Sequence, residues 1–216
     1  MARINQGILG GFSGKAGTVV GSSWKGRSVM RGLPQVKKNS KSSQDQLNQR
    51  EKFKLMVEFL TGLADMFAIT YRKQAKDISG FNAAVSANIR NAISGVESPF
   101  SIDLAKLQFG YANGNLPNGL EPKVSVVPAH QISFSWQNNA GFGKAKASDI
   151  AIGVVYCPAQ KQAISFPDMA IREDETATIA LQEFAGELVE TWILFLSEDE
   201  KLVSPTLYTG QVTLVL

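Results

Sequence analysis

The spacing of the hydrophobic residues changes once along the chain, near residue 100. Before that point, apolar residues recur at helical spacing in two segments, at about residues 43–71 and 79–94. After it, apolar and polar residues alternate in short runs, which are separated by proline, glycine, asparagine or acidic residues. The chain is therefore expected to place its helices before a half that consists of β-strands.

The alternating half contains seven candidate strands and no helical stretch between them. The clearest is residues 132–136, where Ile132, Phe134 and Trp136 alternate with serines. The other candidates are residues 124–127, 150–157, 163–166, 176–181, 188–196 and 207–216. Closely spaced short strands of this kind are typical of an antiparallel β-sandwich. We expect residues 100–216 to form such a sandwich autonomously, with Trp136 and Trp192 in or near its core.

These strands resemble those of a fibronectin type III or immunoglobulin-like domain. The resemblance rests on residues 132–136 as strand B, residues 192–196 as strand F, and Ser204-Pro205 before the last strand. The chain has one cysteine, so the inter-sheet disulfide of antibody domains cannot form within it. That difference favours the fibronectin-like variety.

The two helical segments predict an α-hairpin over residues 42–99. Ser43 and Gln46 fit a capping box at the start of the first helix, and Gly95 supplies a stop after the second. Gly62 is a weak point, because glycine inside a helix costs about 1 kcal/mol relative to alanine. Each helix carries an apolar stripe, which must be buried against another surface.

Residues 1–41 form a basic, glycine-rich segment that contains eight lysines and arginines and no acidic residue. Residues 18–24 and 27–31 flank Lys25-Gly26, a pattern that predicts a β-hairpin, and residues 37–43 read as a linker. Glycine makes ordering costly, so we expect this β-arm to need a partner surface. The predicted fold class is α+β, with the arm (1–41), the helical hairpin (42–99) and the sandwich (100–216) as three domains.

Charge is divided unevenly along the chain. Residues 1–96 contain 15 Lys/Arg and 5 Asp/Glu, whereas residues 97–216 contain 7 Lys/Arg and 14 Asp/Glu. A basic arm can neutralise phosphates while an aromatic side chain stacks on exposed bases, or it can dock on an acidic protein surface such as another copy's second half. We favour the protein contact. The candidate nucleic-acid or partner-binding residues are Lys15, Trp24, Lys25, Arg27, Arg31, Lys37 and Lys38.

The sequence predicts no catalytic site, no metal site and no cofactor. Gly14-Lys15 lacks a phosphate-loop context, because Leu9 stands where the Walker pattern requires glycine and Ala16 replaces its Ser/Thr. His130 has no acidic residue near it in sequence. Cys157 ends an apolar run and is expected to behave as a small buried hydrophobe.

Two acidic clusters, at residues 173–175 and 198–200, fall in predicted loops. Neighbouring side chains in a consecutive run diverge, so we interpret both clusters as solvated loop charge. No apolar stretch reaches the roughly 20 residues of a membrane helix, and no signal peptide is evident. The expected location is cytoplasmic or virion-associated.

Residues 1–110 strongly resemble an uncharacterised family encoded in bacterial genomes, prophages and phages, and the resemblance extends more loosely to the second half. It is carried by the run GILGGFSGKAGTVVGSSWKG at residues 7–26, MRGLP at 30–34, QLNQREKF at 46–53 and FNAAV at 81–85. The resemblance implies a structural protein of mobile elements and no established activity.

The sequence therefore predicts a non-enzymatic structural or interaction protein. Its most concrete version is a phage or prophage virion component that forms oligomers with itself or other structural subunits through the arm. The alternatives are a nucleic-acid-binding protein that uses the basic arm and a ligand- or sugar-binding β-sandwich module.

Overall fold

The computed structural model describes residues 3–4, 10–24, 26–33 and 41–214. The chain divides into two compact units, Met1–Ser43 and Gln44–Leu216. The first is an N-terminal sheet and the second contains helices and a β-sandwich, so the fold is of the α+β class. The predicted segments 42–99 and 100–216 pack together within the second unit.

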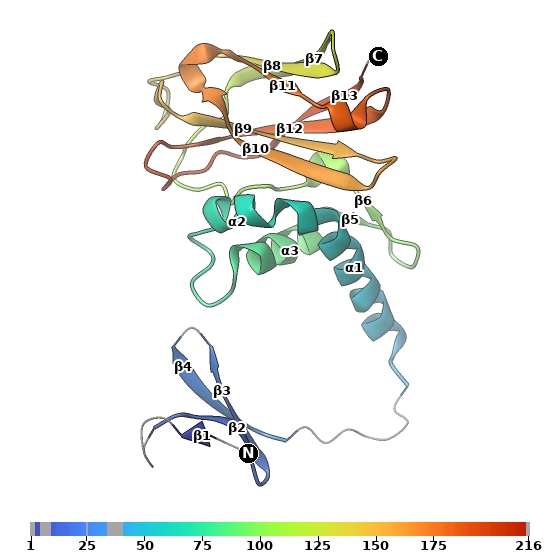
Figure 1. The fold of residues 1–216 in the computed structure, drawn as a ribbon, viewed down its shortest axis with the longest axis vertical. Helices are drawn as coiled ribbons and strands as arrows, with labels where there is room; N and C mark the ends of the chain where they lie inside the picture. The colour runs from blue at the N-terminus through green and yellow to red at the C-terminus, as the bar shows by residue number, and fades with distance from the viewer. Residues whose placement is uncertain (1–2, 5–9, 25, 34–40, 215–216) are drawn as a thin grey trace. The chain divides into compact units, whose positions relative to one another are not determined.

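The N-terminal sheet has four antiparallel strands in sequence order (Figure 1). They are β1 (Arg3–Ile4), β2 (Phe12–Ala16), β3 (Val19–Trp24) and β4 (Arg27–Gly32). The predicted hairpin is confirmed, because Trp24 pairs with Arg27 across a turn in which Gly26 has a φ of +79°. A left-handed φ of this kind is the conformation that glycine adopts without strain. Sequence reasoning missed the two preceding strands, which have only two and five residues.

Three α-helices form one layer of the second unit: α1 (Gln44–Leu60), α2 (Ala64–Thr70) and α3 (Gly80–Asn91). The structure corrects the expectation of one continuous first helix, because a 3₁₀ turn at Thr61–Leu63 separates α1 from α2. A Cβ on Gly62 would lie 2.6 Å from the carbonyl oxygen of Ala163, a residue of the sandwich. The glycine that weakens the helix is thus the residue that lets the turn approach a strand closely.

The sandwich contains all seven predicted strands. They are β7 (Leu120–Val127), β8 (Gln131–Gln137), β9 (Ile150–Cys157), β10 (Gln162–Ile171), β11 (Thr176–Ala180), β12 (Leu188–Leu196) and β13 (Leu207–Thr213). One antiparallel sheet has the order β11-β8-β7 and the other β10-β9-β12-β13. This three-plus-four order is the fibronectin type III arrangement, in which β8 and β12 occupy the positions of the predicted strands B and F.

Two hydrophobic cores lie on opposite faces of the four-stranded sheet. Phe134, Trp136 and Phe195 belong to the core between the two sheets. Trp192 and Leu194 belong to a second core, which they share with buried residues of the helices. Figure 1 accordingly shows the helices against the sheet on the side away from β7 and β8.

Both predicted tryptophans are buried, but in different cores. Side chains alternate between the faces of a strand, so Trp192 points away from Phe195 and toward the helices. Its indole Nε1 donates a hydrogen bond to the carbonyl oxygen of Leu104, at 2.9 Å. Without the helices this face of the sheet would be exposed. Autonomous folding of residues 100–216 stays a prediction, and the shared core argues against it.

Buried polar side chains hold the segment that connects the helices to the sandwich. This segment contains the short strands β5 (Ile93–Ser94) and β6 (Ser101–Ile102). The Asn88 side chain exchanges two hydrogen bonds with the backbone of Gln108, and the Thr70 hydroxyl donates to the carbonyl of Phe109. These bonds satisfy buried polar groups while holding the helical layer on the sheet.

Candidate interaction surfaces

Four of the seven predicted binding residues lie in the described part of the N-terminal sheet. Lys15 is in β2, Trp24 ends β3, and Arg27 and Arg31 are in β4. Lys25, Lys37 and Lys38 lie outside the described residues. The four described side chains are all exposed.

The strand register brings these four side chains to one face of the sheet. Lys15 is paired with Val20, which is paired with Arg31 on the far strand. Trp24 is paired with Arg27, and residues two apart on one strand share a face. We call the surface formed by Lys15, Trp24, Arg27 and Arg31 the basic face.

The opposite face carries no charged residue among those described in β2, β3 and β4. Its side chains include Phe12, Ser23, Ser28 and Met30. Phe12 lies over Gly21, where an added Cβ would come within 2.6 Å of the ring. An aromatic ring over a glycine in the next strand compensates for the side chain that glycine lacks. The sheet is therefore sharply two-sided.

Among the described strands, β4 is the last of this sheet and lies beside β3. Every residue of β4 is exposed, and Met30 exposes 66% of its surface. Trp24 at the end of the neighbouring strand exposes 57%. Exposed apolar side chains at this end of the sheet offer a surface for contact with another chain.

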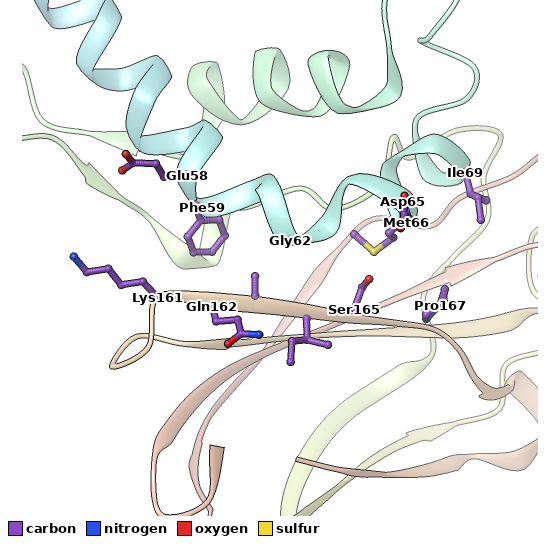
Figure 2. A pocket seen from close by; sticks show the side chains of 12 residues that line it. Glu58, Phe59, Gly62, Asp65, Met66, Ile69, Lys161, Gln162, Ser165 and Pro167 are labelled. Atoms are coloured by element: carbon purple, nitrogen blue, oxygen red, sulfur yellow. The ribbon is translucent and has the colours of Figure 1, made fainter. Parts of the chain in front are cut away.

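A separate groove lies within the second unit, between the helical layer and β10 (Figure 2). Its volume is about 540 Å³. One wall consists of Lys161 to Ser165 and Pro167, along β10, which among the described strands pairs with β9 alone. The other wall runs from the end of α1 through the turn at Gly62 into α2. We call this feature the β10 groove.

The helical wall of the β10 groove is acidic at two positions and apolar between them. Glu58 and Asp65 are exposed, whereas Phe59 and Met66 are largely buried beneath the groove. Glu58 forms an exposed pair with Lys54 at 3.7 Å, one turn back on the same helix. Lys161 stands at one end of the strand wall. Sequence reasoning missed this groove, and Gly62 was its one local sign.

A buried ion pair, also unforeseen, lies inside the sandwich. Arg172 and Asp149 are both fully buried, with Nε 3.1 Å from Oδ2. The guanidinium also donates to the Asn139 side chain and to the Pro117 carbonyl, and it stacks over the Phe195 ring at 4.1 Å. Burial lowers the pKa of Arg172, and Asp149 partly offsets that shift. The groups that contact Arg172 belong to the sandwich and its loops, so we interpret the ion pair as a contribution to the stability of the sandwich.

A tyrosine–carboxylate pair lies on β12 and β13, on the face of the sheet that also carries Trp192. The Tyr208 hydroxyl donates to the nearly buried Glu190. Burial, together with the hydrogen bond to this carboxylate, raises the pKa of Tyr208 to about 12. The phenol of Tyr208 therefore keeps its proton at neutral pH.

The residues that were weighed as candidate chemistry do not converge on one another. Cys157 is buried in the inter-sheet core, as predicted, and His130 lies in the turn between β7 and β8. Within the described ranges, no group of three or more His, Cys, Asp or Glu residues could hold a metal ion. Among the same residues, no helix is long and apolar enough to cross a membrane.

The acidic clusters lie in turns, as expected, but several of their side chains have local partners. Glu175 accepts a hydrogen bond from the amide of Asn138, and Glu200 pairs with Arg72 at 2.7 Å. Hydrogen bonds from Ser197 and Lys201 hold the pKa of Asp199 below its usual range. These contacts stabilise the conformation of the loops in which the acidic clusters lie.

Comparison with known proteins identifies the family and finds similar solved structures. No protein with a curated description matches the chain in sequence. The solution structure of the fn3 domain of the human collagen alpha-1(XX) chain is similar over 50% of this chain and 94% of that chain, with 13% identity and a TM-score of 0.33. The model of a family of unknown function, DUF6266, matches residues 11–210. Because this match covers most of the chain, from β2 through the helices into the last strand of the sandwich, the chain belongs to the DUF6266 family.

Proposed function

We propose that the protein is a non-enzymatic interaction protein, which uses its basic face to bind an acidic surface of another protein subunit. One observation carries the proposal: three cationic side chains and an exposed tryptophan share one face of a two-sided sheet. Clustered charge steers association toward surfaces of opposite sign, and tryptophan is enriched where binding energy concentrates. A phage or prophage structural subunit is the finer version of this proposal, and it rests on the family resemblance seen in the sequence.

The non-enzymatic part of the proposal rests on composition and on the separation of the reactive groups. The whole chain has one histidine and one cysteine, and they occupy a turn and a core. The three-plus-four sandwich is an architecture that many interaction modules share. These observations support binding to another protein, and not catalysis, as the function.

The experiment measures binding of the full chain to a fluorescein-labelled poly-L-glutamate peptide by anisotropy, across a range of salt concentrations. The test variant is the triple substitution Lys15→Gln, Arg27→Gln, Arg31→Gln. It removes three contacts, each worth roughly 0.2–1 kcal/mol at an exposed site, so binding should weaken about tenfold.

The matched control removes three exposed lysines from the second unit, by Lys123→Gln, Lys144→Gln and Lys146→Gln. The change in net charge is the same, but the basic face is intact. We expect the control to bind the acidic peptide as the unmodified chain does. Equal weakening in both triple variants would show that net charge alone drives binding, and that result would overturn the proposal.

Nucleic-acid binding is the second candidate function, because Trp24 is exposed on the same face as the cations. A base stacked on an aromatic ring contributes about 1–3 kcal/mol. The test uses a labelled oligothymidylate in the same assay. If nucleic acid is the partner, the chain should bind the oligothymidylate more tightly than polyglutamate, and this binding should depend steeply on salt. Binding should also weaken about tenfold or more in Trp24→Ala, which removes the ring on which a base would stack. Weak binding to the oligothymidylate that does not change in the Trp24 variant would favour a protein partner over nucleic acid.

A further inference from the structure

Two asparagines of the chain are followed directly by glycine, at Asn113-Gly114 and Asn118-Gly119, and both pairs lie in the loop before β7. This dipeptide is reactive, because the backbone nitrogen of glycine can attack the side-chain carbonyl carbon of asparagine without hindrance from a Cβ. The two pairs have opposite surroundings in the fold, which predicts that they react at different rates.

The second pair is buried and held by hydrogen bonds. The Asn118 side-chain nitrogen donates to the carbonyl oxygens of Ile193 and Pro205, at 3.2 and 2.8 Å. The amide of Gly119 donates to Oδ1 of Asn118 at 2.8 Å. Such a donor lies near the plane of the carbonyl, whereas a nucleophile must approach its carbon from above that plane. A Cβ on Gly119 would lie 2.9 Å from that of Trp136, so the backbone has little room to rotate.

The first pair is accessible. Gly114 is exposed, and its φ of +70° places it in a turn outside the strands. Among the residues that the structure describes, none forms a hydrogen bond with the Gly114 amide. This nitrogen is therefore open to water, which can take up its proton, and no hydrogen bond has to break before it turns toward the Asn113 side chain.

Lys73 lies at the reacting carbonyl of the first pair. Its Nζ donates to Oδ1 of Asn113 at 3.2 Å. A positive charge at this oxygen stabilises the negative charge that develops there when the carbon is attacked. The nitrogen that must leave, Nδ2, donates to the Tyr111 carbonyl at 3.3 Å, a longer hydrogen bond than either of those that hold Asn118. The surroundings of Asn113 therefore favour the steps that those of Asn118 oppose.

We propose that Asn113 is a site of deamidation, assisted by Lys73, and that the fold protects Asn118 from the same reaction. The Gly114 nitrogen bonds to Cγ of Asn113, the Cγ–Nδ2 bond breaks, and ammonia leaves with the proton of the Gly114 amide. Water then adds across one C–N bond of the cyclic imide, which gives aspartate or isoaspartate. The reaction consumes one water molecule, releases one ammonia and transfers no electrons.

The reaction replaces a neutral amide by a carboxylate beside Lys73. Lys73 belongs to the connection between α2 and α3, whereas Asn113 belongs to the loop before β7. With aspartate at position 113, the hydrogen bond between these segments becomes an ion pair. With isoaspartate the main chain is one carbon longer, so the loop must change its course. The modification therefore alters the charge and the conformation of this loop.

The experiment incubates the intact chain at neutral pH and follows both asparagines by mass spectrometry. Trypsin releases residues 107–123 as one peptide, and fragmentation assigns the mass change to position 113 or 118. A sample digested at time zero corrects for reaction during digestion. We expect Asn113 to react at least about tenfold faster than Asn118, because a buried, hydrogen-bonded group reacts only in the fraction of molecules that open locally.

Two comparisons separate the effect of the fold from that of the sequence. In concentrated urea the chain is unfolded, so the two rates should become similar. Lys73→Met should slow the reaction of Asn113 about threefold in the folded chain, because the lost contact is an exposed one, and should leave the rate in urea unchanged. The matched control, Lys54→Met, removes an exposed lysine of α1 and should change neither rate.

Equal rates for the two asparagines in the folded chain would overturn the proposal, because the fold would then not distinguish them. An Asn113 that reacts in urea but not in the folded chain would contradict the accessibility of its loop. A Lys73→Met variant that reacts as fast as the unmodified chain would remove Lys73 from the proposal. The basic face takes no part in this reaction, so these results leave the proposed binding function to its own test.

Discussion

Replacing Gly62 by alanine sets two physical effects against each other. The φ of Gly62 is not left-handed, so the backbone itself accepts alanine, and such a replacement commonly stabilises a protein by about 0.4–1 kcal/mol. The structure predicts the opposite result. The new Cβ would lie 2.6 Å from the carbonyl oxygen of Ala163, where ordinary contact begins at 3.4 Å. The turn and β10 would have to separate by about 0.8 Å.

Overpacking of this kind costs about 1–3 kcal/mol, because backbone meets backbone and neither atom belongs to a flexible side chain. After the gain from alanine is subtracted, we expect a net loss of about 1–2 kcal/mol. Urea denaturation measures it directly, and the melting temperature should fall by about 2–8 °C.

The control is Gly32→Ala, which makes the same chemical change where nothing lies within 4 Å of the new Cβ and φ is not left-handed. It should leave the unfolding of the second unit unchanged. If Gly62→Ala were stabilising, the turn would not lie against β10 as described, and the wall of the β10 groove would be misplaced.

Two further predictions concern buried polar groups. Arg172→Met should destabilise the chain by about 3–5 kcal/mol in urea denaturation, because it strands the buried Asp149 carboxylate, and Asp149→Asn in the same chain should recover part of that loss; an unchanged stability would contradict the buried pair. The raised pKa of Tyr208 means that its stabilising effect is complete below pH 10, the unfolded value, and is lost as pH rises toward about 12. Tyr208→Phe should therefore show a smaller decline of stability between pH 10 and 12 than the unmodified chain, and an identical decline would refute the contribution of the Glu190 hydrogen bond.

The positions of the sandwich strands along the sequence could be predicted because each strand carries its own signal. Residues 150–157 and 188–196 were expected as strands, and β9 and β12 have these limits. Their near-continuous apolar runs reflect burial on both faces. Those runs could not show which layer, the other sheet or the helices, covers each face. Trp192 was expected in the sandwich core, and it packs under the helices because tertiary contacts, not local pattern, decide which face is covered.

The candidate site was partly predictable for a similar reason. Lys15, Trp24, Arg27 and Arg31 stand out in sequence, and the alternation of a strand already separates one face from the other. Their convergence depends on the register between β2, β3 and β4, which composition does not encode. The β10 groove joins segments about a hundred residues apart, so no local pattern reports it.

Amide hydrogen exchange of the intact chain, followed as poly-L-glutamate is added, tests the central claim most directly. Binding of the acidic peptide to the basic face should slow exchange in β3 and β4, the strands that carry Trp24, Arg27 and Arg31. The chain with Lys15→Gln, Arg27→Gln and Arg31→Gln should show little slowing at the same peptide concentration. If β3 and β4 exchange at the same rate with and without the peptide, the basic face does not bind an acidic surface.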